Sequence, residues 1–281
     1  AAALAGLLAR NVSQPVRRLG QTVSRLSDGD YEARAAITRL DEVGALANHV
    51  NQLATTLEKN RTARQRWIAD IAHELRTPVA VLKGEIEALA DGVRQADERM
   101  LISLADEVNH LVGLVDDLQA LALADAGALN VVKREVDFST LVSQSADAFR
   151  NRMAERNIQL EIRAGEEVGL LADPQRIRQL LHNLLENSSR YVETGGRVRL
   201  ALSQGPETVL ELDDSGPGVD GDQLGRLFER FYRVESSRSR ATGGSGLGLS
   251  ICKNIVEAHG GWIETDHSPL GGLRIRIGFP G

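Results

Sequence analysis

The stretch of residues 68–78 reads IADIAHELRTP, and it decides how the rest of the chain is organised. Apolar side chains recur in it and beyond it at steps of three, four and seven, which places them along one stripe of an α-helix. His73 stands two residues from both Ile71 and Leu75, roughly 200° around the helix from either. The stretch therefore predicts an exposed imidazole on the face opposite a buried stripe. That stripe comprises Trp67, Ile71, Leu75, Leu82, Ile86 and Leu89.

The neighbours of His73 add a carboxylate, a hydroxyl and a defect in the helix. Glu74 follows directly, and Thr77 lies one turn on. Pro78 has no N–H to offer the carbonyl of Glu74, so we expect the helix to be kinked or loosened just past the histidine. Alone, this pattern would indicate a solvated surface histidine. Its significance depends on a nucleotide site later in the chain.

The composition favours a multidomain, helix-rich protein. A chain of 281 residues is long enough for two or more domains. The balance of 33 basic and 39 acidic residues does not indicate a nucleic-acid-binding face. The single cysteine, Cys252, excludes a disulfide framework or a cysteine metal cluster and fits a reducing compartment.

The N-terminal residues 1–9, AAALAGLLA, are small and apolar, and Arg10, Arg17 and Arg18 follow them. This run is shorter than the about 20 residues that cross a bilayer. It also lacks the basic start and cleavage site of a signal peptide. We interpret residues 1–10 as the end of a transmembrane helix with the arginines on its cytoplasmic side. An ordinary alanine-rich helix end is the alternative.

Two short heptad patterns follow, separated by the helix-stop signal SDGD at residues 27–30. Such helices, joined by an extended connector holding the lone apolar Ile37, cannot bury their seams alone, so a dimeric four-helix bundle is expected. Pro15 would open the first helix, and residues 41–42 would open the second. The arrangement resembles a HAMP relay module, and a plain coiled-coil spacer is the alternative. The seams comprise Val16, Leu19, Val23 and Leu26, then Val43, Leu46, Val50, Leu53 and Leu57.

A second helical hairpin is expected around the histidine. Residues 58–66 are polar and lack a helix breaker, so the second heptad helix should run into the histidine segment. Gly92 marks a turn, and residues 125–129, DAGAL, indicate a hinge. The apolar faces are too wide for one partner, which predicts another dimeric four-helix bundle. The second stripe comprises Leu101, Leu104, Val108, Leu111, Val115, Leu118 and Leu121.

From about residue 131 the hydrophobic period changes, and strands and helices mix without a regular βαβ alternation. We therefore expect an α+β layer sandwich. Strands are predicted at residues 159–163, 197–202, 208–212, 262–265 and 273–277, and helices at residues 139–155, 174–190 and 247–259.

Three patterns in this last domain suit a bound nucleotide. Asn183 and Asn187 lie one turn apart on a helix, with Arg190 on the next turn. Amide oxygens suit Mg²⁺, and a guanidinium neutralises phosphate charge. Asp214 follows a strand and opens the run DSGPG, where a buried carboxylate would accept from an exocyclic amine and glycines would admit a flat base. Residues 243–249, GGSGLGL, run into a helix whose N–H groups suit phosphate. Each pattern by itself occurs more often in an ordinary turn, a solvated helix face or a surface loop than in a nucleotide site.

Five segments together resemble the H, N, G1, F and G2 boxes of the sensor histidine kinases of two-component systems: residues 71–78, 183–191, 214–218, 227–233 and 244–249. The resemblance implies a HAMP relay at residues 11–62 and a dimerisation and phosphotransfer hairpin at residues 63–126. Residues 127–281 would form an α+β ATP-binding domain of the GHKL type.

The resemblance also implies roles for particular residues. His73 would be the phosphoacceptor and Glu74 its general base, while Glu74 and Thr77 would orient the water that dephosphorylates a partner regulator. Asn187, supported by Asn183, would hold Mg²⁺, and Asp214 would recognise adenine. The lid, roughly residues 234–242, would close over the triphosphate. The remaining nucleotide contacts would be Arg190, Tyr191, Gly216, Gly218, Tyr232, Arg233, Gly244, Gly246, Leu247 and Gly248.

By the same resemblance, the protein would be a homodimeric, ATP- and Mg²⁺-dependent protein-histidine kinase. It would pass phosphoryl from His73 to an aspartate on a response regulator, and it would be the cytoplasmic part of a bacterial inner-membrane sensor of envelope stress. Three other classes compete with this reading. They are a GHKL-type ATPase or chaperone, a serine kinase of the anti-sigma type, and a structural adaptor with a decayed site. Related ATPases carry a glutamate where Asn183 stands, and an amide cannot act as that base, which favours the kinase.

Overall fold

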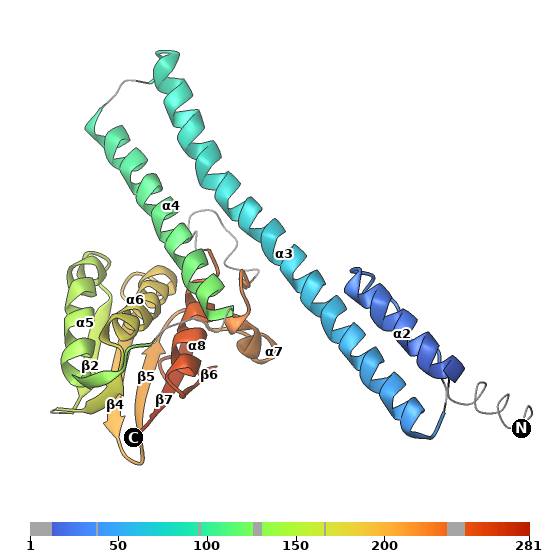
Figure 1. Cartoon of the computed structure of the whole chain (residues 1–281). Helices are drawn as coiled ribbons and strands as arrows, with labels where there is room; N and C mark the ends of the chain where they lie inside the picture. Colours follow the sequence, from blue (N-terminus) through green and yellow to red (C-terminus); the bar gives the residue numbers. More distant parts are fainter. Residues whose placement is uncertain (1–12, 38, 95–96, 126–130, 166, 235–244) are drawn as a thin grey trace, which may run out of the picture. The chain divides into compact units, whose positions relative to one another are not determined.

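The computed structural model describes residues 13–37, 39–94, 97–125, 131–165, 167–234 and 245–281 (Figure 1). The predictions for residues 1–10, for residues 126–129 of the hinge, for residues 235–242 of the lid and for Gly244 lie outside these ranges. The chain divides into two units, Ala1–Val79 and Ala80–Gly281, and each is described by itself.

The first unit begins with two helices whose ends match the sequence signals. Helix α2 (Gln14–Ser27) has Pro15 in its first turn, and Gly29 just beyond it takes a left-handed φ of 89°. Helix α3 (Glu42–Ala90) begins after Asp41, whose side chain accepts from the N–H of Gly44 at 3.1 Å. A hydrogen bond from Arg39 lowers the pKa of Asp41, which keeps this capping carboxylate charged.

Within one chain, the heptad helices fully bury only a small part of the predicted seam. Leu19 and Leu26 of α2 are buried, and they pack in two clusters with Ala47 and Ala54 of α3, which are fully buried. Alanine fits there because the connector between the helices passes close by. Leu46 and Leu53 stay exposed in the single chain, and their predicted place in the seam of a dimeric bundle remains a prediction. The outward seam is left 45–54% exposed and comprises Val16, Val23, Leu46 and Leu53.

The connector between α2 and α3 is fixed by buried alanines and by hydrogen bonds as well as by Ile37. Ile37 is half-buried and packs in one cluster with the buried Ala35, and Ala33 is buried in the second cluster. The side chain of Asn51 accepts from the Ala35 N–H at 2.8 Å and donates to the Ala35 carbonyl at 3.2 Å. These two bonds satisfy the extended backbone as a neighbouring strand would.

Helix α3 runs unbroken through the polar residues 58–66 and the histidine segment, as the absence of a breaker predicts. Pro78 lies inside the helix, so the missing N–H does not end it. In the part of the chain that the structure describes, no helix has the length and apolarity needed to cross a membrane.

The second unit opens with the end of α3 and helix α4 (Glu98–Asp125). Gly92 turns the chain with a φ of 69°, and Asp97 caps α4 by accepting from the Met100 N–H at 2.8 Å. The burial of the predicted apolar stripe on α4 increases toward its C-terminal end: Leu101 is 58% exposed, whereas Leu121 is fully buried. Only the C-terminal end of α4 contributes to the main core of this unit.

The remainder of the second unit is the α/β sandwich expected from the sequence. Its five-stranded sheet has the order β2-β4-β5-β7-β6, in which only β2 and β4 are parallel. A separate two-stranded sheet pairs β1 with β3, and both short strands escaped prediction because four residues carry too little alternation. The strands are β1 (Arg134–Asp137), β2 (Gln159–Ala164), β3 (Gly169–Ala172), β4 (Arg197–Gln204), β5 (Glu207–Asp214), β6 (Trp262–His267) and β7 (Leu273–Pro280). The helices are α5 (Phe138–Glu155), α6 (Pro174–Tyr191), α7 (Gly221–Leu224), the 3-10 helix η2 (Gly225–Phe228) and α8 (Gly248–Ala258).

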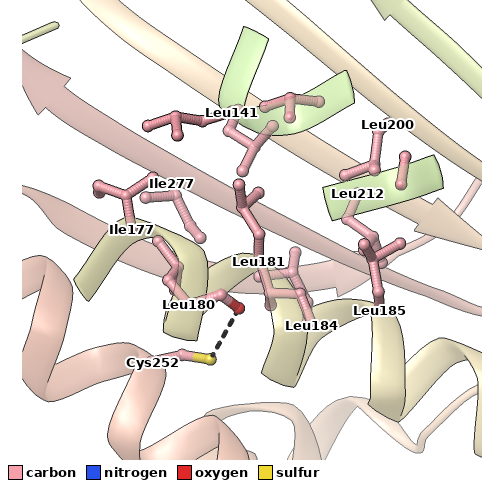
Figure 2. Close-up of a cluster of buried hydrophobic side chains, with 14 of the residues drawn as sticks. Leu141, Ile177, Leu180, Leu181, Leu184, Leu185, Leu200, Leu212, Cys252 and Ile277 are labelled. Carbon is pink, nitrogen blue, oxygen red and sulfur yellow. Dashed lines mark hydrogen bonds between the residues drawn. The ribbon is translucent and has the colours of Figure 1, made fainter. Parts of the chain in front are cut away.

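One face of the sheet packs against α5, α6 and α8 in a single core. Figure 2 shows Leu185 of α6 pointing toward the sheet residues Leu200 and Leu212. Cys252 is buried in α8, and its thiol donates to the Leu180 carbonyl at 3.8 Å. Because burial raises the pKa of Cys252, this thiol is inert rather than nucleophilic.

The other sheet face is covered with charges that pair across strands. Asp213 of β5 accepts two hydrogen bonds from Arg274 of β7, at 2.7 and 2.9 Å. Arg276, opposite Glu211 in the register, bridges Glu211 at 3.0 Å and Glu264 of β6 at 2.7 Å. This alternation of a buried apolar face and a paired polar face accounts for the period of two in the sequence.

Candidate functional site

A cavity of about 550 Å³ lies in the second unit, walled by α6, by the loop that follows β5, by one side of α4, and by Ser245, Gly246, Gly248 and Leu249. The structure brings into it residues from four of the predicted motifs, although these are up to 66 positions apart in the chain. The predicted residues that line it are Asn183, Asn187, Arg190, Tyr191, Asp214, Gly216, Gly218, Tyr232, Arg233, Gly246 and Gly248.

Helix α6 supplies the amides and the cation of this wall. Asp173 caps the helix by accepting from the Gln175 N–H at 2.9 Å, and Pro174 occupies its first turn. Leucines on one face fix the helix on the core, which presents Asn183 and Asn187 to the cavity. Asn183 also donates to the Gly248 carbonyl at 3.4 Å, linking α6 to the start of α8 and leaving its amide oxygen for other partners.

Asp214 is buried at the end of β5 and lines the cavity. Its Oδ1 accepts from the Gly216 N–H at 2.9 Å and from the Leu273 N–H at 3.0 Å. Both of these bonds from the described residues go to Oδ1, so Oδ2 is the oxygen that would accept from a ligand amine. Burial, together with the charge of Asp213, raises the pKa of Asp214 in spite of the two backbone donors.

Two glycines make this geometry possible. A Cβ on Gly272 would lie 2.2 Å from Asp214 Oδ1, so only glycine lets β7 approach the carboxylate. Gly246 has a φ of 68°, and a Cβ there would lie 2.8 Å from the backbone of Phe231. The Phe231 N–H donates to the Gly246 carbonyl at 3.0 Å, which joins the phenylalanine segment to the glycine-rich loop.

Leu247 does not line the cavity, although the sequence analysis placed it among the nucleotide contacts. Its side chain is fully buried in the core, and it precedes α8 as the N-cap residue. Its carbonyl accepts from the Ser250 hydroxyl at 2.7 Å, which fixes the start of α8. The leucine therefore anchors the loop while its glycine neighbours face the cavity.

Several lining residues were not predicted. Glu186 and His182 project from the same helix as the asparagines, and Asn109, His110 and Asp117 come from α4. Glu186 was detectable, since it precedes Asn187 and stands one turn before Arg190. The α4 residues carry no sequence signal of their own, because only the packing of α4 brings them to the wall.

A metal ion would have to be held by amides and by the nucleotide. In the described ranges, no group of three or more histidine, cysteine, aspartate or glutamate side chains is placed to bind a metal. The oxygens of Asn187 and Asn183 are hard ligands that suit Mg²⁺, which commonly takes its other ligands from phosphate and water. The residues present therefore fit a metal ion that arrives with a nucleotide.

The histidine segment belongs to the first unit. His73 is exposed on α3, as its position relative to the apolar stripe predicts, and Glu74 is half-buried. The Thr77 hydroxyl donates to the His73 carbonyl at 3.4 Å, a bond typical of threonine within a helix. The helix thus offers an accessible imidazole with a carboxylate next to it.

Comparison with known proteins identifies the class to which these parts belong. Three family profiles match successive parts of the chain: "HAMP domain" at residues 7–59, "His Kinase A (phospho-acceptor) domain" at residues 63–127, and "Histidine kinase-, DNA gyrase B-, and HSP90-like ATPase" at residues 172–281. The chain therefore belongs to the sensor histidine kinases of two-component systems.

Among individual proteins, the chain is 50% identical over 275 residues to the signal transduction histidine-protein kinase BaeS of Escherichia coli K12. The match covers 98% of this chain and 59% of BaeS, so the chain spans about three fifths of that relative's length. The Acinetobacter baumannii histidine kinase AdeS has a similar structure, with a TM-score of 0.63 and 28% identity over 74% of this chain and 97% of the AdeS chain.

A third comparison is with the histidine kinase ThkA, solved in complex with the response regulator TrrA. It has a TM-score of 0.61 and 22% identity, and covers 80% of this chain and 66% of that one. At this identity the comparison supports the fold alone.

Proposed function

We propose that this chain is the catalytic part of an ATP-dependent protein-histidine kinase that acts as a homodimer. The observation that carries the proposal is the cavity in which Asp214, Asn187 and Arg190 meet, each suited to a different part of ATP. An exposed histidine on α3 supplies the acceptor. The product would be a phosphohistidine at His73, from which an aspartate on a response regulator takes the phosphoryl group.

The residues divide the chemistry between binding and nucleophilic attack. Asp214 Oδ2 would accept from the exocyclic amine of adenine, and Arg190 would neutralise phosphate charge. Bound by Asn187 and Asn183, Mg²⁺ would neutralise further phosphate charge. The unprotonated ring nitrogen of His73 would attack the γ-phosphorus while Glu74 accepts the proton from the other ring nitrogen. The new N–P bond replaces the P–O bond to ADP, which leaves with the electron pair.

A hydrolase is the second candidate, because GHKL-type ATPases share the fold. Asn183 argues against it, since an amide cannot take a proton from water as a carboxylate does. Steady release of phosphate by a variant without His73 would favour the hydrolase.

We further propose the arrangement of the whole protein. Residues 1–10 would end a transmembrane helix, residues 11–62 would form the HAMP relay, residues 63–126 the phosphotransfer hairpin and residues 127–281 the ATP-binding domain. This portion would lie on the cytoplasmic side of a bacterial inner membrane. Its likeness to BaeS supports a role in envelope-stress signalling.

The test of the kinase proposal is labelling with γ-labelled ATP and Mg²⁺. We expect wild-type protein to acquire label that is lost in acid and survives alkali, and His73→Gln to acquire none. His49→Gln is a matched control, because it removes another exposed imidazole of the same helix, away from the cavity. Acid-stable label would indicate a serine kinase, and label persisting in His73→Gln would place the acceptor elsewhere.

A phosphatase activity toward the regulator is proposed for the same helix. Thr77→Ala should keep autophosphorylation within about twofold while regulator dephosphorylation falls by at least about tenfold, because a positioned water loses its hydrogen-bond partner. The measurement is loss of label from phosphorylated regulator in the presence of ADP. Unchanged dephosphorylation would rule out this role for Thr77.

A further inference from the structure

Glu186 lies between two arginines at the wall of the nucleotide cavity. It accepts two hydrogen bonds from Arg152 of α5, Nη1 to Oε2 at 2.6 Å and Nη2 to Oε1 at 2.9 Å. The same Oε1 accepts from Nη2 of Arg190 at 3.2 Å, one turn along α6. Glu186 and Arg190 line the cavity, whereas Arg152 reaches them from outside it.

Packing against an aromatic ring and two hydrogen bonds hold the pairing of Arg152 with Glu186 in place. The guanidinium of Arg152 lies 5.8 Å from the ring centre of Phe149, which is itself buried in the core. Arg152 therefore holds the carboxylate of Glu186 in the bidentate geometry that fixes a guanidinium plane.

The balance of charge determines what Arg190 offers to a phosphate. Two guanidinium groups and one carboxylate leave one net positive charge at this wall. Without Arg152, Glu186 would pair with Arg190 alone, and the wall would present no net positive charge. The wall would then attract the negatively charged triphosphate less strongly.

We propose that Arg152 and Glu186 are positioning residues for the triphosphate of ATP, acting through Arg190. Glu186 holds the Arg190 side chain at the cavity wall through one nitrogen, so its other N–H groups can donate to phosphate. Arg152 neutralises Glu186 so that this tether does not cancel the charge of Arg190. The inference rests on the proposed kinase function and assigns a task to a residue outside the cavity.

The test compares ATP with adenosine, because only ATP carries the phosphates. In the full chain, Arg152→Met should weaken Mg-ATP binding by about tenfold. It should leave the affinity for adenosine, measured by competition, unchanged within about twofold. The KM for ATP in autophosphorylation should rise in parallel, with kcat at saturating ATP changed far less. A general loss of packing would weaken both ligands and lower Tm.

A double variant separates charge balance from simple contact loss. Arg152→Met with Glu186→Gln removes the unmatched negative charge but keeps an oxygen that can accept from Arg190, so ATP affinity should return to within about threefold of wild type. Additive loss in the double variant would overturn the proposal, as would an unchanged ATP affinity in Arg152→Met. Arg150→Met is the matched control, because Arg150 lies on the same helix and pairs only with the exposed Asp147 among the described residues.

The outcomes also distinguish this inference from the proposed function. If wild-type protein binds no ATP, the kinase proposal fails before any variant is made. If wild type binds ATP and labels His73 while Arg152→Met behaves like Arg150→Met, only the positioning role fails.

Discussion

At the scale of single residues, Asp214 commits one carboxylate oxygen to the fold, and the proposed function assigns the other to the ligand. Oδ1 is committed to the backbone N–H groups of Gly216 and Leu273, which holds the loop after β5 against β7. Oδ2 is the oxygen that would accept from adenine. The structural role of this side chain therefore depends on Oδ1, and its proposed binding role depends on Oδ2.

Replacing Asp214 by asparagine tests that separation. Asp214→Asn keeps Oδ1 as an acceptor but puts an NH₂ group where the adenine amine also needs an acceptor. We expect a loss of about 2 kcal/mol in ATP binding, or roughly thirtyfold, because two donors face each other. Isothermal titration calorimetry with Mg-ATP measures the affinity, and the thermal midpoint should move by only a few degrees.

Asp213→Asn is the control for that experiment. Asp213 is the preceding carboxylate, it is buried, and it pairs with Arg274 on the opposite face of the sheet. Its replacement should cost some stability and leave the ATP affinity unchanged. An equal loss of affinity in both variants would mean that Asp214 acts only through the fold.

At the scale of elements, α4 belongs to two environments. Its N-terminal half exposes apolar residues, whereas Leu121 near its end is fully buried in the α/β core. Asp117 lies between these regions and lines the cavity. Burial, with the charge of the adjacent Asp116, raises the pKa of Asp117 to about 6. A charged Asp117 therefore weakens the packing of α4 at neutral pH.

The pH dependence of this effect has a definite sign. Because the pKa of Asp117 is raised from 3.8 to about 6, its stabilising contribution is complete below about pH 4 and is lost as the pH rises through 6. Asp117→Asn should therefore stabilise the second unit at pH 7.5 by about 1 kcal/mol after allowance for solvent screening. That corresponds to a rise in Tm of about 2–4 °C.

Thermal unfolding followed by circular dichroism measures the difference. The variant and the wild type should converge as the pH falls toward 4. Asp106→Asn, which changes an exposed aspartate on the same helix, should shift Tm by about one degree or less at either pH. A gain for Asp117→Asn that is equally large at pH 4 would show that titration of Asp117 is not its cause.

At the scale of the whole molecule, both units expose apolar side chains at regular helical spacing. In the first unit these are the outward seam residues of α2 and α3. In the second unit α4 exposes Val108, Val112 and Val115 by 48%, 54% and 53%. Apolar stripes on helices are stable when another helix covers them, so these faces support the proposed homodimer.

An aspartate in the stripe on α4 tests the dimer. Val112→Asp would place an unpaired charge in the predicted helix interface, where burial costs several kcal/mol. We expect the dimer dissociation constant to rise by at least about a hundredfold, as measured by sedimentation equilibrium. Binding of ATP should persist, because Val112 does not line the cavity.

Gln119→Asp is the matched control, since it introduces the same side chain at an exposed polar position of α4. It should leave the dimer intact. A dimer that survives Val112→Asp unchanged would show that this stripe is not the interface.

The sequence by itself determined the order of the elements and the chemical groups of the site. The period of 3.6 around His73 placed the imidazole on the exposed face of α3, and the absence of a breaker before it predicted a continuous helix. The alternation in the last domain located all five strands of the main sheet to within a few residues. These features are local, because helix periodicity, capping and strand alternation depend on neighbours within a few positions.

Tertiary structure decided which of those groups share a cavity and which lie elsewhere. It buried Leu247 in the core, chose Ala47 and Ala54 over Leu46 and Leu53 for the in-chain seam, and required glycine at position 272 beside Asp214. It also brought Arg152 to Glu186 across 34 positions. Each of these outcomes depends on the space between elements that are distant in the chain. The spacing of residues along one helix or strand carries no information about that space.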